Sequence, residues 1–212
     1  MKIALIGATG YIGSALLEEA VNRGHDVKAL VSRPGNVPAQ AGVQAVRADV
    51  QDSDALALQL AGADAVISAF SGHAQQDVHG YYVRGIESIV AAAKTARVPR
   101  LLVVGGAGSL EVAPGVQLVD TPAFPAQWKA TAEGARDALR LLRAESELDW
   151  TMLSPAALIE PGQRTGIFRL GTDSLLTDGE GNSRISLQDY AVAMIDELER
   201  PAHARARFTV AY

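Results

Sequence analysis

The amino-acid sequence predicts a doubly wound α/β fold, with a mostly parallel sheet and helices on both faces. Short apolar, β-branched runs alternate with longer segments of helical period, which is the pattern of repeated βαβ units. A glycine-rich loop joins the first apolar run to the first helical segment, a connection typical of this fold class. The chain has 212 residues, the length of one domain, so we expect residues 1–212 to form a single domain.

Six parallel strands are expected from the apolar runs. They are Lys2–Ile6, His25–Val31, Val43–Arg47, Ala63–Ser68, Arg100–Val104 and Asp149–Leu153. The helical segments between them place apolar residues on one face, as at Ile86, Ile89, Val90 and Ala93. These faces are expected to cover the sheet.

Two stretches rich in turn-forming residues interrupt the alternation, Gly105 to Gln127 and Ala156 to Ser183. Both follow strand ends, where open α/β sheets bind ligands, so we expect them to wall a substrate pocket. After them a closing helix is expected, with Ser186 as its N-cap and Pro201 as its stop, and then a last strand at Phe208–Val210. Residues 156–212 would therefore form a small C-terminal extension on the substrate side.

Charge and composition restrict the partners. The formal net charge of −5 does not suit an extended phosphate backbone, so no nucleic-acid partner is expected. The absence of cysteine excludes disulfides, thiolate metal ligands and a cysteine nucleophile, and it fits a reducing compartment. The apolar run after Lys2 is too short for a secretion signal, and no run reaches the roughly 18 residues that span a membrane. We therefore expect a cytoplasmic protein with no membrane partner.

The loop Gly7-Ala8-Thr9-Gly10-Tyr11-Ile12-Gly13 lies between a strand and a helix, the context that the dinucleotide-binding fingerprint requires. The first glycine permits a tight turn, the second lets the backbone approach a pyrophosphate, and the third lets helix and strand pack closely. Amides at the start of the helix would hold the anion. The cofactor-binding residues predicted from this loop are Gly7, Thr9, Gly10, Tyr11, Ile12 and Gly13.

The end of the second strand predicts which cofactor is used. About 20 residues after the loop, an NAD site places an acidic residue on the ribose 2′-hydroxyl, but this chain has Ser32 and Arg33 there. A serine hydroxyl and a guanidinium suit the 2′-phosphate, so NADP (NADPH) is predicted, with NAD as the alternative. The other predicted cofactor contacts are Asp49 and Val50 at the adenine, and Ser68, Ala69 and Phe70 at the nicotinamide side.

These segments, together with Gly105-Gly106-Ala107-Gly108-Ser109, resemble the atypical short-chain dehydrogenase/reductases. Within them the chain is similar to the NADH-flavin reductase group, which shows tracts similar to Phe124–Lys129, Leu153–Ala156 and Phe168–Gly171. The resemblance covers most of the chain. It implies a Rossmann-type sheet, a bound NADP or NAD, and a reductase activity.

The usual catalytic pair of the wider family is absent. That pair is a tyrosine followed four residues later by a lysine, and it protonates the product of carbonyl reduction. Here Tyr11, Tyr81, Tyr82 and Tyr190 are followed at that spacing by Ala15, Gly85, Ile86 and Met194. Ser109, after the fifth strand, and Lys129, before a helix, are the remaining candidates for catalytic residues, with a turn-capping serine and a solvated lysine as the alternative interpretation.

Two further chemistries are not favoured. His73 and His79 flank Asp77, but no third strong ligand accompanies them, so we expect no metal site. The sequence also lacks the Gly-x-Ser-x-Gly motif of serine hydrolases.

These observations favour an NADPH-dependent reductase that passes hydride to a small planar acceptor such as a flavin or quinone. Such an acceptor takes hydride at one atom and its proton from water, so it needs no Tyr–Lys pair; a flavin would be a substrate only. The alternative is a non-enzymatic NADPH-sensing or binding protein. A sugar-nucleotide epimerase or dehydratase is less favoured, since the tail after Pro155 is small for that substrate domain. The expected partner is a small-molecule substrate, and the sequence leaves monomer and homodimer open.

Overall fold

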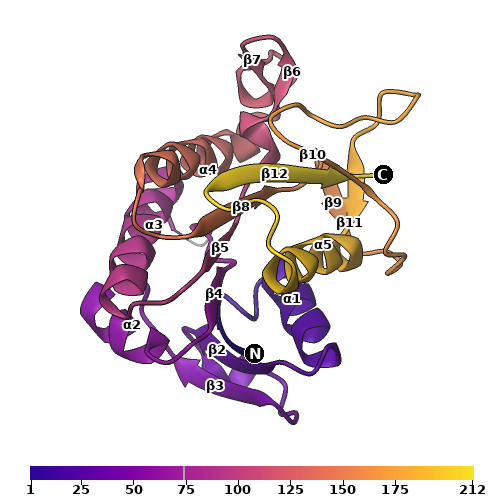
Figure 1. The fold of residues 1–212 in the computed structure, drawn as a ribbon. Coiled ribbons are helices and arrows are strands. Elements are labelled where there is room, and N and C mark those ends of the chain that lie inside the picture. The colour runs from indigo at the N-terminus through magenta and orange to yellow at the C-terminus, as the bar shows by residue number, and fades with distance from the viewer. Residues whose placement is uncertain (74) are drawn as a thin grey trace.

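A computed structural model describes residues 1–73 and 75–212. Its centre is an eight-stranded sheet in the order β10-β12-β8-β5-β4-β1-β2-β3 (Figure 1). The strands are β1 (Lys2–Ile6), β2 (Asp26–Val31), β3 (Val43–Arg47), β4 (Ala65–Ser68), β5 (Leu101–Val104), β8 (Trp150–Ser154), β10 (Arg169–Gly171) and β12 (Ala206–Ala211). Every neighbouring pair is parallel except β10 and β12, which are antiparallel. The predicted doubly wound, mostly parallel sheet is confirmed.

The six expected strands are all present. β1 and β3 have the expected bounds, whereas the others begin one or two residues later, at Asp26, Ala65, Leu101 and Trp150. Two residues expected to start strands are held by their side chains instead. His25 Nε2 lies 2.9 Å from Glu199 Oε1, and Arg100 donates to Glu197 at 2.6 Å. The last strand, β12, is longer than expected and pairs in parallel with β8.

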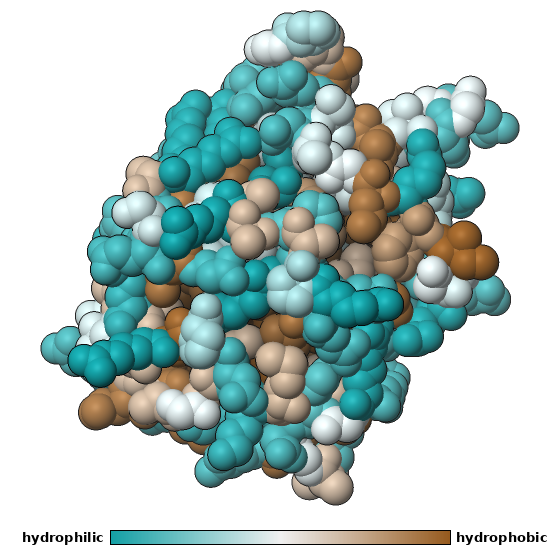
Figure 2. Space-filling view, in the orientation of Figure 1, coloured by the Kyte–Doolittle hydropathy of each residue, from teal (hydrophilic) through white to brown (hydrophobic). Residues whose placement is uncertain are grey.

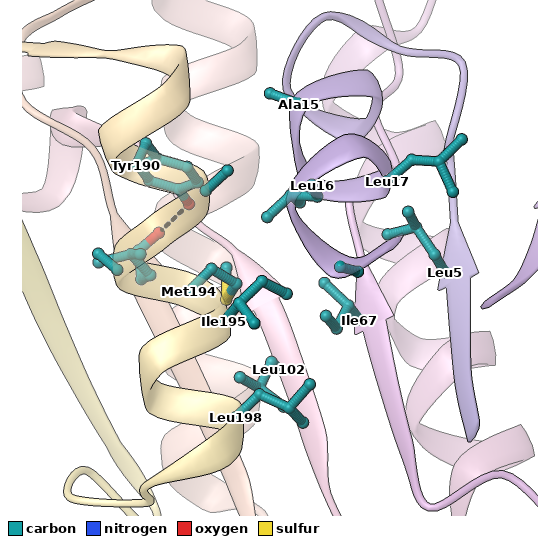
Figure 3. Packing of buried hydrophobic residues seen from close by; sticks show 14 of the residues in the cluster. Leu5, Ala15, Leu16, Leu17, Ile67, Leu102, Tyr190, Met194, Ile195 and Leu198 are labelled. Atoms are coloured by element: carbon teal, nitrogen blue, oxygen red, sulfur yellow. Dashed lines mark hydrogen bonds between the residues drawn. The ribbon is translucent and has the colours of Figure 1, made fainter. Parts of the chain in front are cut away.

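Helices cover both faces of the sheet. In the described residues α1 (Tyr11–Asn22) and α5 (Leu187–Glu199) pack together on one face, and α2 (Ser53–Leu60), α3 (Val78–Thr95) and α4 (Ala126–Ala144) pack in series on the other. Each face carries its own hydrophobic cluster. Figure 3 shows Leu16 of α1 facing α5, where Ile195 lies beside Ile67 of the sheet. The burial of both sheet faces explains why the strands are continuous apolar runs.

Hydrogen bonds join the C-terminal segment, residues 156–212, to the rest of the sheet. β9 (Leu158–Glu160) and β11 (Arg184–Ser186) form a separate parallel pair. Ser186 caps α5 as predicted, because its hydroxyl accepts from the Asp189 amide at 2.9 Å. The Tyr190 hydroxyl donates to the Leu153 carbonyl at 2.7 Å, which ties α5 to the end of β8. The start of α5 therefore lies at the carboxyl end of β8, while β10 and β12 of the same segment are strands of the sheet.

The stretch from residue 105 to 127 consists mainly of short turns and a small hairpin. It holds two 3₁₀ turns, Ala107–Ser109 and Leu118–Asp120, and a hairpin of β6 (Glu111–Ala113) and β7 (Val116–Gln117). A third 3₁₀ turn, Pro34–Asn36, follows β2.

The outer surface is mainly hydrophilic on the face shown in Figure 2, with hydrophobic side chains gathered near the C-terminal strands. Ile167 and Leu170, on and beside β10, are among the exposed large hydrophobic residues. Among the helices of the described residues, none combines the length and the apolar character needed to span a bilayer.

Candidate functional site

The glycine loop makes a tight connection between β1 and α1. Gly7 has a φ of +79°, a conformation that side chains disfavour, and its amide donates to the Leu30 carbonyl of β2 at 2.9 Å. A Cβ atom on Gly13 would clash with the Gly7 carbonyl group, whose carbon would lie 2.9 Å away. The absence of side chains at these two positions therefore lets α1 begin directly above the end of β1.

Gly10 has a different role from the other two glycines. A Cβ atom built there would meet only the Gly7 carbonyl oxygen within 4 Å, at 3.2 Å, so its other side is open. Gly10 is the N-cap of α1, without a capping side chain, and its φ of −77° is ordinary. The first turn, Tyr11 to Ser14, contains no acidic residue. Open space beside uncapped helix amides fits a bound phosphate group.

A hollow of about 400 Å³ lies at the carboxyl ends of β1 to β4, next to this loop. Its lining residues are Ile6, Gly7, Thr9, Leu30, Val31, Ser32, Arg47, Ala48, Asp49, Val50, Ala69, Phe70, Ser71, Gln75 and Tyr81. The structure thus brings together seven predicted cofactor residues, namely Gly7, Thr9, Ser32, Asp49, Val50, Ala69 and Phe70. The remaining predicted cofactor residues lie outside the lining.

Those remaining residues have three kinds of environment. Gly10 to Gly13 lie at the start of α1, where backbone amides are their main feature. Ser68 is buried in β4, and its hydroxyl accepts from the Phe70 amide at 3.4 Å. Arg33 is exposed after β2, and its guanidinium makes no hydrogen bond or ion pair in the part of the chain that the structure describes.

A second hollow, of about 530 Å³, lies at the opposite edge of the sheet, at the amino ends of β1 to β3. Lys2, Asp26 and Gln44 are among its lining residues, and none of the predicted site residues is. Because ligands of open α/β sheets bind beyond the carboxyl ends of the strands, we assign the candidate site to the hollow beside the glycine loop.

Aromatic side chains form one wall of the candidate site. The rings of Phe70 and Tyr82 are stacked, with centroids 5.9 Å apart and planes 5° apart, and Tyr81 lies 5.5 Å from Phe70 at a tilt of 41°. Burial raises the pKa of the Tyr82 hydroxyl well above its ordinary value, so this hydroxyl stays neutral. Phe70 and Tyr81 face the hollow, and the buried Tyr82 packs behind Phe70.

The end of β3 is tied to α3 through Gln51. Its side-chain amide donates to the Tyr81 carbonyl at 3.1 Å, while its backbone amide donates to Asp49 Oδ1 at 2.9 Å. Asp49, predicted to contact the adenine, is exposed at this point. These contacts hold the loop after β3 against the aromatic wall.

Tyr11 links the glycine loop to the C-terminal segment. Its ring is 58% exposed, and its hydroxyl donates to the Ile159 carbonyl of β9 at 3.3 Å. The C-terminal segment therefore borders the start of α1.

The two predicted catalytic residues lie in unlike environments. Ser109 is buried, and its hydroxyl accepts from Arg207 Nη1 of β12 at 3.4 Å. The same guanidinium donates to Ser154 at 3.3 Å and pairs with Asp173. Lys129 is exposed in the first turn of α4, and no hydrogen bond joins it to Ser109 within the described residues.

The histidines after β4 have separate partners. His79 Nε2 lies 2.9 Å from Asp137, and His73 Nδ1 lies 3.3 Å from the Thr131 hydroxyl. Asp77 caps α3 by accepting from the Gly80 amide at 2.9 Å. No group of three or more side chains that could hold a metal ion occurs in residues 1–73 and 75–212.

Sequence reasoning missed several residues that line the site, notably Arg47, Gln75 and Tyr81. Arg47 is the last residue of β3, in register with Val31 of β2. The rule that open α/β sheets bind ligands beyond the carboxyl ends of their strands could have indicated Arg47. Tyr81 lies in α3 and had no comparable signal.

Comparison with known proteins gives a consistent fold and inconsistent names. A family model described as NAD(P)H-binding matches residues 7–199. A candidate exported protein of Burkholderia pseudomallei is 49% identical, with a TM-score of 0.91 and 100% of both chains covered. A candidate epimerase of Bacteroides thetaiotaomicron is 44% identical (TM-score 0.93; 100% of this chain and 96% of that chain). A candidate NADH-flavin reductase of Streptococcus pneumoniae is 36% identical (TM-score 0.88; 100% and 99%).

Proposed function

The chain belongs to the NAD(P)H-binding family and is an NAD(P)H-dependent oxidoreductase, and we propose that NADPH is its hydride donor and a small planar molecule its acceptor. The resemblance to atypical short-chain dehydrogenase/reductases is confirmed by this family and by the solved neighbours. A flavin or quinone is the acceptor class that we favour. The Streptococcus neighbour is itself described as a candidate NADH-flavin reductase.

The observation that carries the proposal is the pairing of the glycine loop with the hollow beside it. The open side of Gly10 and the uncapped amides of α1 fit a pyrophosphate, and Ser32 lines the hollow where an NAD site would carry an acid. Arg33 follows Ser32 directly. A hydroxyl and a guanidinium at this position favour a 2′-phosphate over a free 2′-hydroxyl.

The acceptor class is inferred from the surroundings of the two candidate catalytic residues. The Ser109 hydroxyl is held by Arg207 in the interior, and Lys129 lies in solvent. Reduction of an aldehyde or ketone produces a strongly basic alkoxide, which a side-chain acid normally protonates. The anion of a reduced flavin or quinone is stabilised by conjugation, so it can take its proton from water. NADPH, when bound, supplies the hydride: one NADPH and one proton reduce one acceptor molecule and leave one NADP⁺.

A turnover panel tests the proposal. The purified protein is incubated with NADPH or NADH and with flavins, quinones and aldehydes, and nucleotide oxidation is followed. We expect faster oxidation of NADPH with flavins or quinones, and none above background with Gly10→Val. Binding of NADPH without turnover would instead support the sensing protein.

The epimerase alternative is separated by the same panel. An epimerase that uses a nicotinamide cofactor returns it to its starting state within each cycle, so it consumes none. Net consumption of NADPH therefore argues against the activity named for the Bacteroides neighbour.

We also propose that the protein acts in the cytoplasm, because a chain without cysteine fits a reducing compartment. The Burkholderia neighbour is described as a candidate exported protein, so the compartment needs its own test. Fractionation of the source cells should place the protein with cytoplasmic markers, and recovery outside the cytoplasm would contradict this assignment.

A further inference from the structure

Arg47 lies at the border of the hollow where the second and third strands end. It is in register with Val31, and the next amide, that of Ala48, donates to the Val31 carbonyl at 2.9 Å. Arg47 therefore stands beside the point where β2 passes into Ser32. Arg47 and Ser32 both line the hollow, whereas Arg33 does not.

The guanidinium of Arg47 has no partner among the residues that the structure describes. Its backbone carbonyl accepts from Gln59 Nε2 at 2.9 Å, which fixes the main chain. Its side chain is exposed, and its guanidinium has neither a hydrogen bond nor an ion pair among residues 1–73 and 75–212. By contrast, Arg100 and Arg207 are each held by a carboxylate. A fixed backbone thus presents an unpaired cation at the edge of a candidate nucleotide site.

We propose that Arg47 is a specificity-determining residue that binds the 2′-phosphate of NADPH together with Ser32. This inference rests on the proposed function. It assigns part of the preference for NADPH to the end of β3, in addition to the residues that follow β2. A planar guanidinium can donate two hydrogen bonds to one phosphate group. Arg47 is in register with Val31, the residue before Ser32, so the hydroxyl and the guanidinium lie at the ends of neighbouring strands. Arg33 does not line the hollow, so it would attract the phosphate mainly through its charge at a distance and not by a direct hydrogen bond.

Calorimetric titration of NADP⁺ and NAD⁺ tests the assignment in the unaltered protein and in Arg47→Ala. We expect Arg47→Ala to weaken NADP⁺ binding about tenfold and to leave NAD⁺ binding nearly unchanged. Arg47→Lys should recover part of the loss, because it keeps the charge but not the planar fork. Arg200→Ala is the matched control: its side chain is 78% exposed at the end of α5, and its removal changes the net charge equally.

The titrations separate the inference from the proposed function on which it rests. If the unaltered protein binds neither nucleotide, the proposed function fails. If it binds them and Arg47→Ala weakens both equally, Arg47 contacts a group common to both nucleotides, and the inference is overturned. Unchanged affinities in Arg47→Ala, with the NADP⁺ preference lost in Arg33→Ala, would also overturn it. Titration of 2′-AMP against 5′-AMP checks the phosphate directly, since only 2′-AMP should lose affinity in Arg47→Ala.

Discussion

The ring of Phe70 occupies the space that a side chain on Gly85 would need. A Cβ atom built on Gly85 would lie within 3.0 Å of three ring atoms of Phe70. Gly85 is in α3, whereas Phe70 follows β4 and lines the hollow beside the glycine loop. The lack of a side chain at Gly85 allows the aromatic wall to pack against α3. This arrangement has a cost, because a glycine in the middle of a helix destabilises it by about 1 kcal/mol relative to alanine.

Gly85→Ala should therefore displace Phe70 and disturb the wall of the hollow. We expect a loss of about 1 to 3 kcal/mol in the free energy of unfolding, despite the better helix propensity of alanine. Affinities for NADPH and NADH should fall by similar factors, because the proposed 2′-phosphate contacts, Ser32 and Arg47, are not part of the aromatic wall. Urea unfolding and calorimetry measure the two effects, with Glu87→Ala on the exposed side of α3 as control. Unchanged stability and affinity would show that Phe70 moves without consequence.

Gly10→Val should abolish binding of both cofactors and leave the fold intact. The φ of Gly10 is ordinary, and its open side is where a pyrophosphate would approach, so the new side chain fills ligand space. Calorimetric titration and circular dichroism check the two parts. Gly179→Val is the control, since a Cβ atom there meets nothing within 4 Å and its loop lies outside the lining of the hollow. Undiminished affinity in Gly10→Val would mean that the loop is structural only.

The parts of the site that were predictable from sequence are those determined by neighbours along the chain. Gly7, Gly13 and the cap at Ser186 depend on a turn or a helix end within a few residues, and the structure places them as expected. Ser109 shows the opposite case. Its hydroxyl accepts a hydrogen bond from Arg207, which lies 98 residues later in the sequence, and no local sequence pattern predicts that contact.

Two residues that line the hollow were missed in the sequence for a similar reason. Arg47 and Tyr81 line it because of strand register and the packing of α3 against the sheet, which are relations between distant segments. Arg33 was predicted from its position after β2, and the structure puts Arg47 at the lining instead. Side-chain direction at a strand end depends on the tertiary surroundings, which spacing alone does not determine.

Glu19 should make stability depend on pH in the acid range. It is a buried carboxylate of α1, paired with Arg164 and Arg23 at 2.7 Å each. The hydrogen bond from Arg164 is the largest influence and, with Arg23, lowers the pKa of Glu19 below its ordinary 4.5 in spite of burial. Because the folded pKa is the lower one, the stabilisation is present above pH 4.5 and is lost as the pH falls through the folded value.

Urea unfolding at a series of pH values tests this dependence. Glu19→Gln should be less stable than the unaltered protein at neutral pH and should lose less stability on acidification. Glu18→Gln, at the exposed neighbouring position, should keep the original profile. Identical acid profiles for the unaltered protein and Glu19→Gln would refute the role of this carboxylate.

Ser109→Ala and Lys129→Ala should slow turnover only moderately. If the acceptor needs no proton from a side chain, each residue contributes at most an orienting or charge-stabilising contact of about 1 to 3 kcal/mol, or roughly a tenfold to hundredfold change in rate. A general acid would contribute roughly a hundredfold to ten-thousandfold, and its removal would delete one limb of the pH–rate profile. Rate measurements against pH for both variants distinguish the two mechanisms. Loss of a limb together with nearly all activity would identify that residue as the acid or the group that tunes it.

Hydride transfer from NADPH to a planar acceptor is tested most directly by an anaerobic reaction with free flavin. The protein, NADPH and flavin are mixed without oxygen, and the absorbances of NADPH and oxidised flavin are recorded together. We predict that both decline at the same protein-dependent rate, with one flavin reduced for each NADPH consumed, and more slowly when NADH replaces NADPH. NADPH that binds to the protein but is oxidised no faster than in its absence, with flavins and quinones alike, would contradict the assignment.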